Sequence, residues 1–293
     1  MKARIIAPRA AAAALVAAAL ASAPALAEEV KTGWFDKAEV SLVATAGNTR
    51  TNTFGFRNTL KRVWEKSMFT IDLGGMQARN ETVDRYAVGD ETNYDINEIR
   101  DNQLVAQNYY LSGRWDQKIS DRFFWYAGAG WDRNRFAGIE NRYTIAGGVG
   151  NIWVDSDKVK FRTDYAVTGT NESPVVPNPG FPESFVGLRF SWAYLHKFGA
   201  NTTYTDKLIL DENLNETSDY RADWTNSLSV SMTSHLALKV SLQWLYRHMP
   251  ALQAVDVYDT PPPPYGDGTK VGTVYQPLEK LDNIFNISLV ANF

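Results

Sequence analysis

The sequence predicts an all-β fold, a transmembrane antiparallel up-and-down β-barrel of about 12 strands. Three features of the chain favour this fold class. Apolar and polar residues alternate along many segments of about 10 to 15 residues, the N-terminus has the form of an export signal, and the chain ends on an aromatic residue, Phe293. Apolar stripes at helical spacing are hard to find, so helices have little part in the prediction.

Residues 1–27 have the three parts of a signal peptide. The basic, apolar and cleavable parts are, in order, Lys2 with Arg4 and Arg9, Ala10 to Ala21, and Ala25-Leu26-Ala27. The apolar part is too short to cross a bilayer as a helix. We therefore expect export of the chain and a barrel over residues 28–293 with no further domain.

Composition excludes several classes of protein. Of the 293 residues, 44% are apolar and 22% are charged, which excludes a disordered chain and a coiled coil. The chain has no cysteine and three histidines, so it offers no thiol nucleophile and little material for a zinc centre. The net charge is −3 with no basic block, so we expect no nucleic-acid partner. We predict no cofactor, no metal site and no catalytic residue.

Each predicted strand has an apolar face for lipid and a polar face for an enclosed interior. The clearest alternation is in 235–249, between Leu236, Leu238, Val240, Leu242, Trp244 and Tyr246 on one face and Ala237, Lys239, Ser241, Gln243, Leu245 and Arg247 on the other. The predicted strands are, in chain order, 37–47, 51–64, 67–79, 102–115, 122–134, 140–154, 158–170, 184–198, 200–212, 219–233, 235–249 and 280–293. Glycines weaken the prediction for 140–154, and mixed faces weaken it for 200–212.

Short and long connections tend to alternate between these strands. The short turns are at 65–66, 116–121, 155–157, 199 and 234, and the longer links are at 80–101, 171–183, 213–218 and 250–279. This pattern predicts an outer-membrane barrel with both termini in the periplasm, because periplasmic turns are tight and outside loops are long. Trp64, Trp115, Trp153 and Phe198 precede short turns, where a periplasmic aromatic girdle is expected.

The last strand carries a further signal of membrane insertion. Its outward positions are Phe285, Ile287, Leu289, Ala291 and Phe293. Outer-membrane barrels characteristically end on an aromatic residue in this way. We therefore predict that Phe293 is the signal read by the barrel-assembly machinery, and that outer-membrane lipid and lipopolysaccharide are the other partners.

A charged pair is predicted at the centre of the chain. If the turn between 122–134 and 140–154 is centred near Ala137, antiparallel pairing places Asp132 opposite Arg142. Alternation then puts both side chains on the inner wall, where an ion pair would fix the register of the hairpin. Solvated charges at the base of a loop are the alternative.

The same stretch carries a resemblance to a known family. The residues in question are Gly47-Asn48-Thr49, the run from Trp131 through Asp132-Arg133-Asn134-Arg135-Phe136-Ala137-Gly138 to Thr144, and Gly147-Gly148-Val149-Gly150. They resemble the salt-stress-induced outer-membrane protein family, a family built on a domain of unknown function. The resemblance implies an outer-membrane β-barrel associated with salt or osmotic stress, with no established substrate and no catalytic residues.

Alternation also predicts which charged residues line the interior. The lumen-lining candidates are Arg57, Lys61, Arg114, Asp132, Arg142, Lys160, Arg162, Asp164, Arg189, Arg221 and Lys239, with Lys197, Arg247, Glu39, Asp72 and Asp223 at the same parity. Basic residues outnumber acidic ones, which favours a narrow passive pore with anion preference. The alternative is a closed plug, because a barrel of about 12 strands is narrow and long side chains can fill it.

The sequence leaves three alternatives open: a barrel with partner-binding loops, a lipid-modifying enzyme, and a soluble barrel or sandwich. The acidic segment 80–101 and the Pro-rich segment 250–279, with Pro261 to Pro264, are candidates for loops that bind a partner. A lipid-modifying enzyme needs a serine beside a base, and His235 follows Ser234, but neighbouring strand residues point to opposite faces. A soluble barrel or sandwich would need the apolar faces to meet one another in a core.

Overall fold

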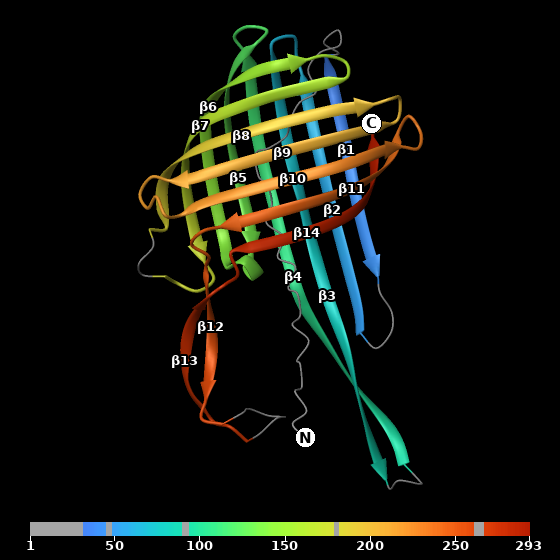
Figure 1. Cartoon of the computed structure of the whole chain (residues 1–293), viewed down its shortest axis with the longest axis vertical. Coiled ribbons are helices and arrows are strands. Elements are labelled where there is room, and N and C mark those ends of the chain that lie inside the picture. The colour runs from blue at the N-terminus through green and yellow to red at the C-terminus, as the bar shows by residue number, and fades with distance from the viewer. Residues whose placement is uncertain (1–31, 45–48, 90–93, 179–181, 261–266) are drawn as a thin grey trace.

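The chain folds into one closed antiparallel β-barrel with two hairpins that project from one end (Figure 1). The computed structural model describes residues 32–44, 49–89, 94–178, 182–260 and 267–293. The signal peptide predicted over 1–27 lies outside these residues. The barrel has 12 strands, each paired with its neighbours in an up-and-down order, so the predicted fold class and strand number are confirmed.

The barrel consists of the first eleven strands and the last. Their bounds are β1 (Gly33–Ala44), β2 (Thr49–Val63), β3 (Ser67–Gly89), β4 (Tyr94–Lys118), β5 (Phe123–Asn134), β6 (Ile139–Asp155), β7 (Val159–Pro174), β8 (Ser184–Phe198), β9 (Thr202–Asn213), β10 (Tyr220–Ser231), β11 (Leu236–Arg247) and β14 (Leu281–Asn292). Strands β12 (Leu252–Tyr258) and β13 (Lys270–Pro277) form a separate two-stranded sheet. We call the end of the barrel with the turns after β2, β4, β6, β8 and β10 the turn side, and the opposite end the loop side.

The first and last strands close the barrel. Strand β14 pairs with β11 along its length and with β1 from Lys37↔Asn292 to Val40↔Leu289. Asp36 and Phe293 exchange two backbone hydrogen bonds at the end of this seam, with N···O distances of 3.2 and 2.8 Å. The C-terminal residue thus belongs to the closing seam, and its side chain is 74% exposed on the outer face.

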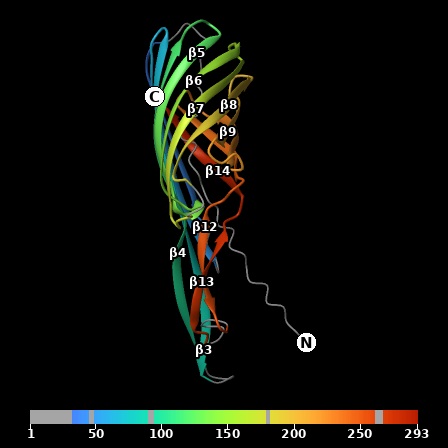
Figure 2. The same cartoon turned by 90° about the vertical axis from the view of Figure 1, so that its left-hand side faces the viewer.

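Two segments predicted as loops contain strands. The segment 250–279 holds the hairpin β12–β13, and most of 80–101 belongs to a ribbon in which β3 and β4 continue past the barrel rim (Figures 1 and 2). Alternation missed both because a two-stranded ribbon outside the barrel has no lipid-facing wall and so needs no apolar face. Pro261 to Pro264 lie outside the described residues.

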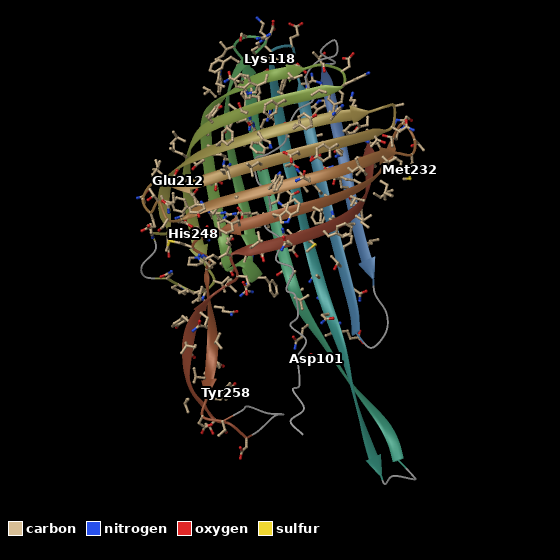
Figure 3. The ribbon with its side chains drawn as sticks, in the orientation of Figure 1. Asp101, Lys118, Glu212, Met232, His248 and Tyr258 are labelled. Carbon is tan, nitrogen blue, oxygen red and sulfur yellow. The ribbon has the colours of Figure 1, made fainter. Side chains whose placement is uncertain are left out.

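The apolar faces of the strands point away from the barrel. Large apolar side chains on the outer surface include Leu42, Ile145 and Phe285, which are 73%, 66% and 63% exposed. Side chains of this kind project around the whole barrel, among them Met232 on the turn side (Figure 3). They do not pack against one another in a globular core, so the soluble alternative is not supported. No helix of the described part of the chain is long and apolar enough to cross a membrane.

Two elements of the central motif shape the loop side. A single 3-10 turn, η1 (Arg135–Ala137), joins β5 to β6, and the Asn134 side chain accepts a hydrogen bond from the Ala137 N–H at 3.1 Å. Gly138 ends the turn with φ of +79°, in the left-handed region that favours glycine. A Cβ on Gly138 would lie 2.2 Å from the Ala251 Cβ, so the missing side chain lets the base of the β12–β13 hairpin rest on the barrel.

Asp132 and Arg142 lie opposite each other, as predicted. They are paired in the register of β5 and β6, and the guanidinium meets the carboxylate through two contacts of 3.0 and 2.9 Å. The side chains are 4% and 12% exposed. Because a slip of one strand by one residue would turn its charged side chain to the lipid face and break the ion pair, the pair favours this register over its neighbours.

We expect Gly138→Ala to lower the free energy of unfolding more than Gly199→Ala. Both glycines have positive φ, which costs an alanine about 1–2 kcal/mol. Only at position 138 does the new methyl group also meet a neighbour, because a Cβ at Gly199 has no atom within 4 Å. Urea unfolding of the refolded barrel, followed by tryptophan fluorescence, measures the difference. Equal losses in the two variants would mean that the hairpin does not rest on Gly138.

We expect Asp132→Ala to destabilise the barrel by about 3 kcal/mol, because it leaves a buried arginine without its nearest carboxylate. The temperature at which the folded band converts to the unfolded band on a gel should fall. Asp121→Ala, in an exposed turn, is the matched control and should change little. An unchanged conversion temperature for Asp132→Ala would remove the role of this pair in holding the hairpin.

Candidate functional site

Charged side chains cross the interior of the barrel at two levels. Each level is a cluster of arginines and carboxylates that come from strands far apart in the barrel wall. We call them the loop-side cluster, made of Asp132, Arg142, Glu172, Asp219, Arg221 and Arg247, and the turn-side cluster, made of Arg114, Asp116, Tyr126, Arg162 and Asp164. Together they form the candidate functional site.

Glu172 is the centre of the loop-side cluster. Arg247 Nη1 lies 2.6 Å from Glu172 Oε1, while Arg221 Nη1 and Arg142 Nη1 lie 3.4 and 3.5 Å from Glu172 Oε2. The Glu172 side chain is 8% exposed, so its charge is compensated by three guanidiniums rather than by bulk water. Arg247 also contacts buried Asp219, at 3.2 Å.

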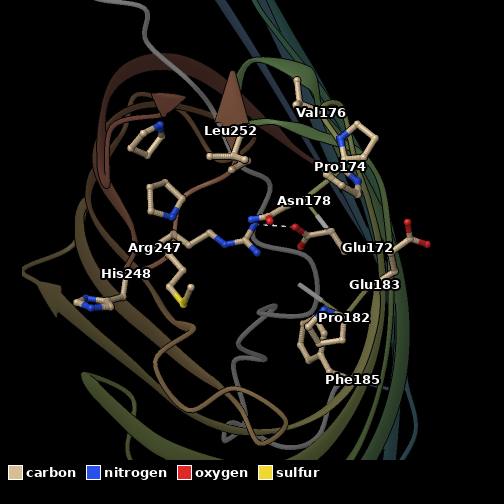
Figure 4. Close-up of a pocket in the computed structure, with 15 residues that line it drawn as sticks. Glu172, Pro174, Val176, Asn178, Pro182, Glu183, Phe185, Arg247, His248 and Leu252 are labelled. Carbon is tan, nitrogen blue, oxygen red and sulfur yellow. Dashed lines mark hydrogen bonds and ion pairs between the residues drawn. The ribbon is translucent and has the colours of Figure 1, made fainter. Parts of the chain in front are cut away.

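The contact between Arg247 and Glu172 spans the barrel mouth. Arg247 ends β11 and Glu172 lies near the end of β7, and β8, β9 and β10 stand between these two strands in the barrel order. Because β7 and β11 are not neighbours in the wall, the two side chains must reach across the interior to meet. Figure 4 shows the Arg247 side chain extending over the opening towards Glu172 (Figure 4).

The turn-side cluster crosses the interior in the same way. Arg114 of β4 contacts Asp116 on its own strand at 2.7 Å and Asp164 of β7 at 3.0 Å, with β5 and β6 between the two strands. The Arg114 guanidinium also lies over the Tyr126 ring, 3.7 Å from its centroid. Arg162 reaches the same two carboxylates at 3.8 and 3.5 Å.

A glycine makes room for the turn-side cluster. A Cβ on Gly150 would lie 2.3 Å from Phe124 and 2.8 Å from the Asp164 carboxylate. Gly150, one of the glycines that weakened the strand prediction for 140–154, therefore has a structural role, because a larger residue there would displace these two side chains.

The remaining predicted lumen residues are found in smaller sets. Arg57 contacts Asp72 at 2.9 Å, and Lys239 of β11 contacts Glu39 of β1 at 2.9 Å across β14. Arg189 makes a two-pronged contact with Asp211, at 2.6 and 2.8 Å. Lys160 lies 3.6 Å from Asp155, and Lys61 is half-buried. The structure thus brings Arg142 and Arg221, and Arg114 and Arg162, into common clusters, while Arg57, Arg189 and Lys239 pair with acidic residues outside these clusters.

Sequence reasoning missed most of the acidic partners. Asp116, Glu172, Asp211 and Asp219 all contact the predicted basic residues. Asp116 and Glu172 fell just beyond the predicted strand ends at 115 and 170, and were therefore read as turn and loop. Extending the inward parity of each strand by two residues would have found both.

A serine and a histidine do meet, contrary to the sequence argument. Ser234 Oγ lies 2.8 Å from His235 Nδ1, because both residues belong to an exposed turn rather than to a strand. None of the described carboxylates hydrogen-bonds to His235, so no third group orients the imidazole as a hydrolytic triad requires. Within the described residues, no group of three or more His, Asp or Glu side chains is arranged to hold a metal ion.

Solved structures that resemble this fold are outer-membrane proteins. A KdgM porin in complex with disordered oligogalacturonate is 6% identical, with 89% of this chain and 99% of that chain covered and a TM-score of 0.42. A NanC porin is 10% identical, with 88% and 99% covered and a TM-score of 0.47, and an anion-selective porin from Comamonas acidovorans is 9% identical, with 90% and 99% covered and a TM-score of 0.37. These values describe a likeness of architecture, and we base no functional argument on them.

Sequence comparison places the chain in a family. No curated protein matches it. The model of one family, described as protein of unknown function, DUF481, matches residues 38–260, which include all of the barrel except its first few residues and its last strand. This chain is therefore a member of the DUF481 family, with the closed 12-stranded β-barrel described above.

Proposed function

We propose that this protein resides in the outer membrane and forms a narrow passage for small polar solutes. The observation that carries the proposal is the division of faces: exposed apolar side chains surround the barrel, while its interior holds arginines, carboxylates and hydroxyls. An apolar interior would need no water, whereas charged groups inside a barrel are solvated by water or by one another. Both chain ends lie in the periplasm in this proposal, with the turn side inward and the loop side facing out.

The loop-side cluster is the constriction of the proposed passage. Its contacts cross the mouth between β7 and β11, so a solute that enters from outside meets the Glu172 carboxylate and its three arginines first. Side chains that bridge a barrel can rearrange without unfolding it, because the wall is held by backbone hydrogen bonds. We therefore infer a passage of low conductance rather than a wide general porin.

We expect the passage to prefer anions only weakly. The sequence suggested a cationic interior, but four acidic partners were missing from the inventory. With Asp116, Glu172, Asp211 and Asp219 included, most of the arginines face a carboxylate, and the field that a solute meets is correspondingly smaller.

A link to salt or osmotic stress is the second part of the proposal. It rests on the resemblance of the central motif to the salt-stress-induced family, and the ion pairs of the mouth offer a physical route. Dissolved salt screens charges over about 10 Å at 0.1 M and about 3 Å at 1 M. The arginine side chains around buried Glu172 are 12–17% exposed, so their contacts weaken as salt rises, although less than exposed ion pairs do. The passage would then widen when external salt is high.

A closed structural barrel is the second candidate function, and the same cross-barrel contacts favour it. If they persist at all salt concentrations, the barrel is a plug, and its role would lie in the projecting hairpins β3–β4 and β12–β13. In either case we propose that the barrel-assembly machinery reads the last strand through Phe293, and that lipopolysaccharide surrounds the loop side. An enzyme is not part of the proposal, because none of the described carboxylates hydrogen-bonds to the Ser234–His235 pair.

We expect Glu172→Gln to raise single-channel conductance severalfold and to shift selectivity towards chloride. The substitution removes the negative charge that holds three guanidiniums together, so they repel one another and present net positive charge at the mouth. Planar bilayers with a KCl gradient measure both quantities. Glu65→Gln, at an exposed carboxylate in the turn after β2, is the matched control and should leave both unchanged.

The same recordings test the link to salt. Conductance of the wild type, divided by the conductivity of the solution, should rise between about 0.1 and 1 M KCl as screening increases. In Glu172→Gln this ratio should change less. If neither the wild type nor the variant conducts after the folded band has been verified on a gel, the passage is refuted and the closed barrel stands.

A further inference from the structure

A pocket of about 460 Å³ lies at the loop-side mouth, above the contact between Arg247 and Glu172 (Figure 4). Three separate parts of the chain form it: the end of β7 and the start of β8 with residues 176–178 and 182–183 between them, the end of β11, and the base of the β12–β13 hairpin. Pockets of this size bind small organic molecules in many proteins, mostly where apolar walls surround a few fixed polar groups. Both conditions are met here.

The walls of the pocket are apolar and stiff. Five prolines line it, namely Pro174, Pro177, Pro182, Pro250 and Pro277. Proline fixes φ, so these wall segments lose little conformational entropy when a ligand orders them. Phe185 and Leu252 add an aromatic and an aliphatic surface.

Backbone hydrogen bonds hold the walls together. The Leu278 N–H donates to the Ala251 carbonyl at 2.9 Å at the base of the hairpin, and the Val175 N–H donates to the Gly138 carbonyl at 2.9 Å on the barrel side. Gly138 also touches the hairpin base directly, since no Cβ separates it from Ala251. The pocket is therefore formed before any ligand arrives.

The polar floor of the pocket favours an anion. Arg247 is the one arginine or lysine among its lining residues, and it reaches over the floor to Glu172. If Arg247 Nη1 turned from Glu172 towards a ligand, Glu172 would still be neutralised by Arg142 and Arg221. Buried Asp219 contacts a different atom of Arg247, Nε, at 3.2 Å, so this contact does not depend on Nη1. A cationic ligand would instead have to displace an arginine and approach the remaining ones.

Charges around the walls of the pocket also favour an anionic ligand. The Arg221 guanidinium lies 5.2 Å from the centroid of the Phe185 ring, so the aromatic wall has a cation against it. The Glu183 carboxylate, at the rim, points away from Arg247 in Figure 4. A carboxylate is the anion whose two oxygens match a guanidinium in geometry.

We propose that this pocket binds a small molecule with an apolar or aromatic body and a single carboxylate. The body lies against the proline walls, Phe185 and Leu252, and the carboxylate accepts hydrogen bonds from Arg247. Arg247 exchanges Glu172 for the ligand, so occupancy breaks the contact that spans the mouth. The proposed passage gives this site a use, but binding itself does not depend on conduction.

The test uses the full chain in lipid nanodiscs and three probes that share one body. Fluorophenylpropionate, fluorophenylpropanol and fluorophenylpropylamine differ only in an anionic, neutral or cationic end, and fluorine NMR reports their binding. Empty nanodiscs measure partition into lipid. The propionate should bind more tightly than the alcohol, and the amine should not bind above the empty-nanodisc level. Equal binding of the three probes, or binding no greater than in empty nanodiscs, would overturn the proposal.

Variants of the pocket locate the binding. Arg247→Gln should weaken propionate binding about tenfold, the usual effect of losing a charged hydrogen bond, and Arg247→Lys should recover part of it. Arg135→Gln, at an arginine in the nearby β5–β6 turn that does not line the pocket, should have no effect. Unchanged binding in Arg247→Gln would place the ligand elsewhere.

A second pair of variants lies outside the barrel wall and so avoids any loss of folding. Leu252→Asn changes the apolar wall of the pocket, while Val255→Asn changes an exposed residue of the same hairpin that does not line it. Only the first should weaken binding of the propionate. Binding measured in this way stays positive even if bilayer recordings show no conductance, so failure of the passage and failure of the pocket are separate results.

Discussion

Closure of the sheet on itself is the constraint on which the rest of the structure depends. Strand β14 pairs with both β11 and β1, so every barrel strand has a hydrogen-bonded neighbour on each side. A closed sheet has only an inside and an outside. Each strand must therefore place alternate residues in two different solvents, and this explains why exposed leucines and valines on one face adjoin buried charges on the other.

The narrow interior explains why its charges are paired. A barrel of this size encloses little water, and an arginine or carboxylate without a partner there would cost several kcal/mol. The observed solution is to share partners: Glu172 meets three arginines, and Asp116 and Asp164 each meet both Arg114 and Arg162. Such shared contacts can be exchanged one at a time. The passage and the ligand pocket proposed above both depend on that property of Glu172 and Arg247.

Sequence alone predicted the barrel and its strands, because a strand with one apolar and one polar face has alternating apolar and polar residues along the chain. It also predicted the contact of Asp132 with Arg142, since parity and turn position suffice for a register. Alternation was followed only to the predicted strand ends at 115 and 170, and Asp116 and Glu172 lie just beyond these positions, within the longer strands β4 and β7. The pocket was out of reach for a related reason: its walls come from connections and from a hairpin whose exposed faces do not alternate, and only the folded chain brings Gly138 against Ala251.

The most direct test asks whether successive side chains of one strand are accessible in turn from the lipid and from the polar interior of the barrel. The chain has no cysteine, so a spin label can be attached at single sites in β10 through Ser227→Cys, Leu228→Cys, Ser229→Cys and Val230→Cys. In lipid bilayers, labels at 228 and 230 should collide mainly with oxygen, which concentrates in lipid, and labels at 227 and 229 mainly with a water-soluble nickel chelate. Absence of this alternation would contradict a barrel that spans the membrane with a polar interior.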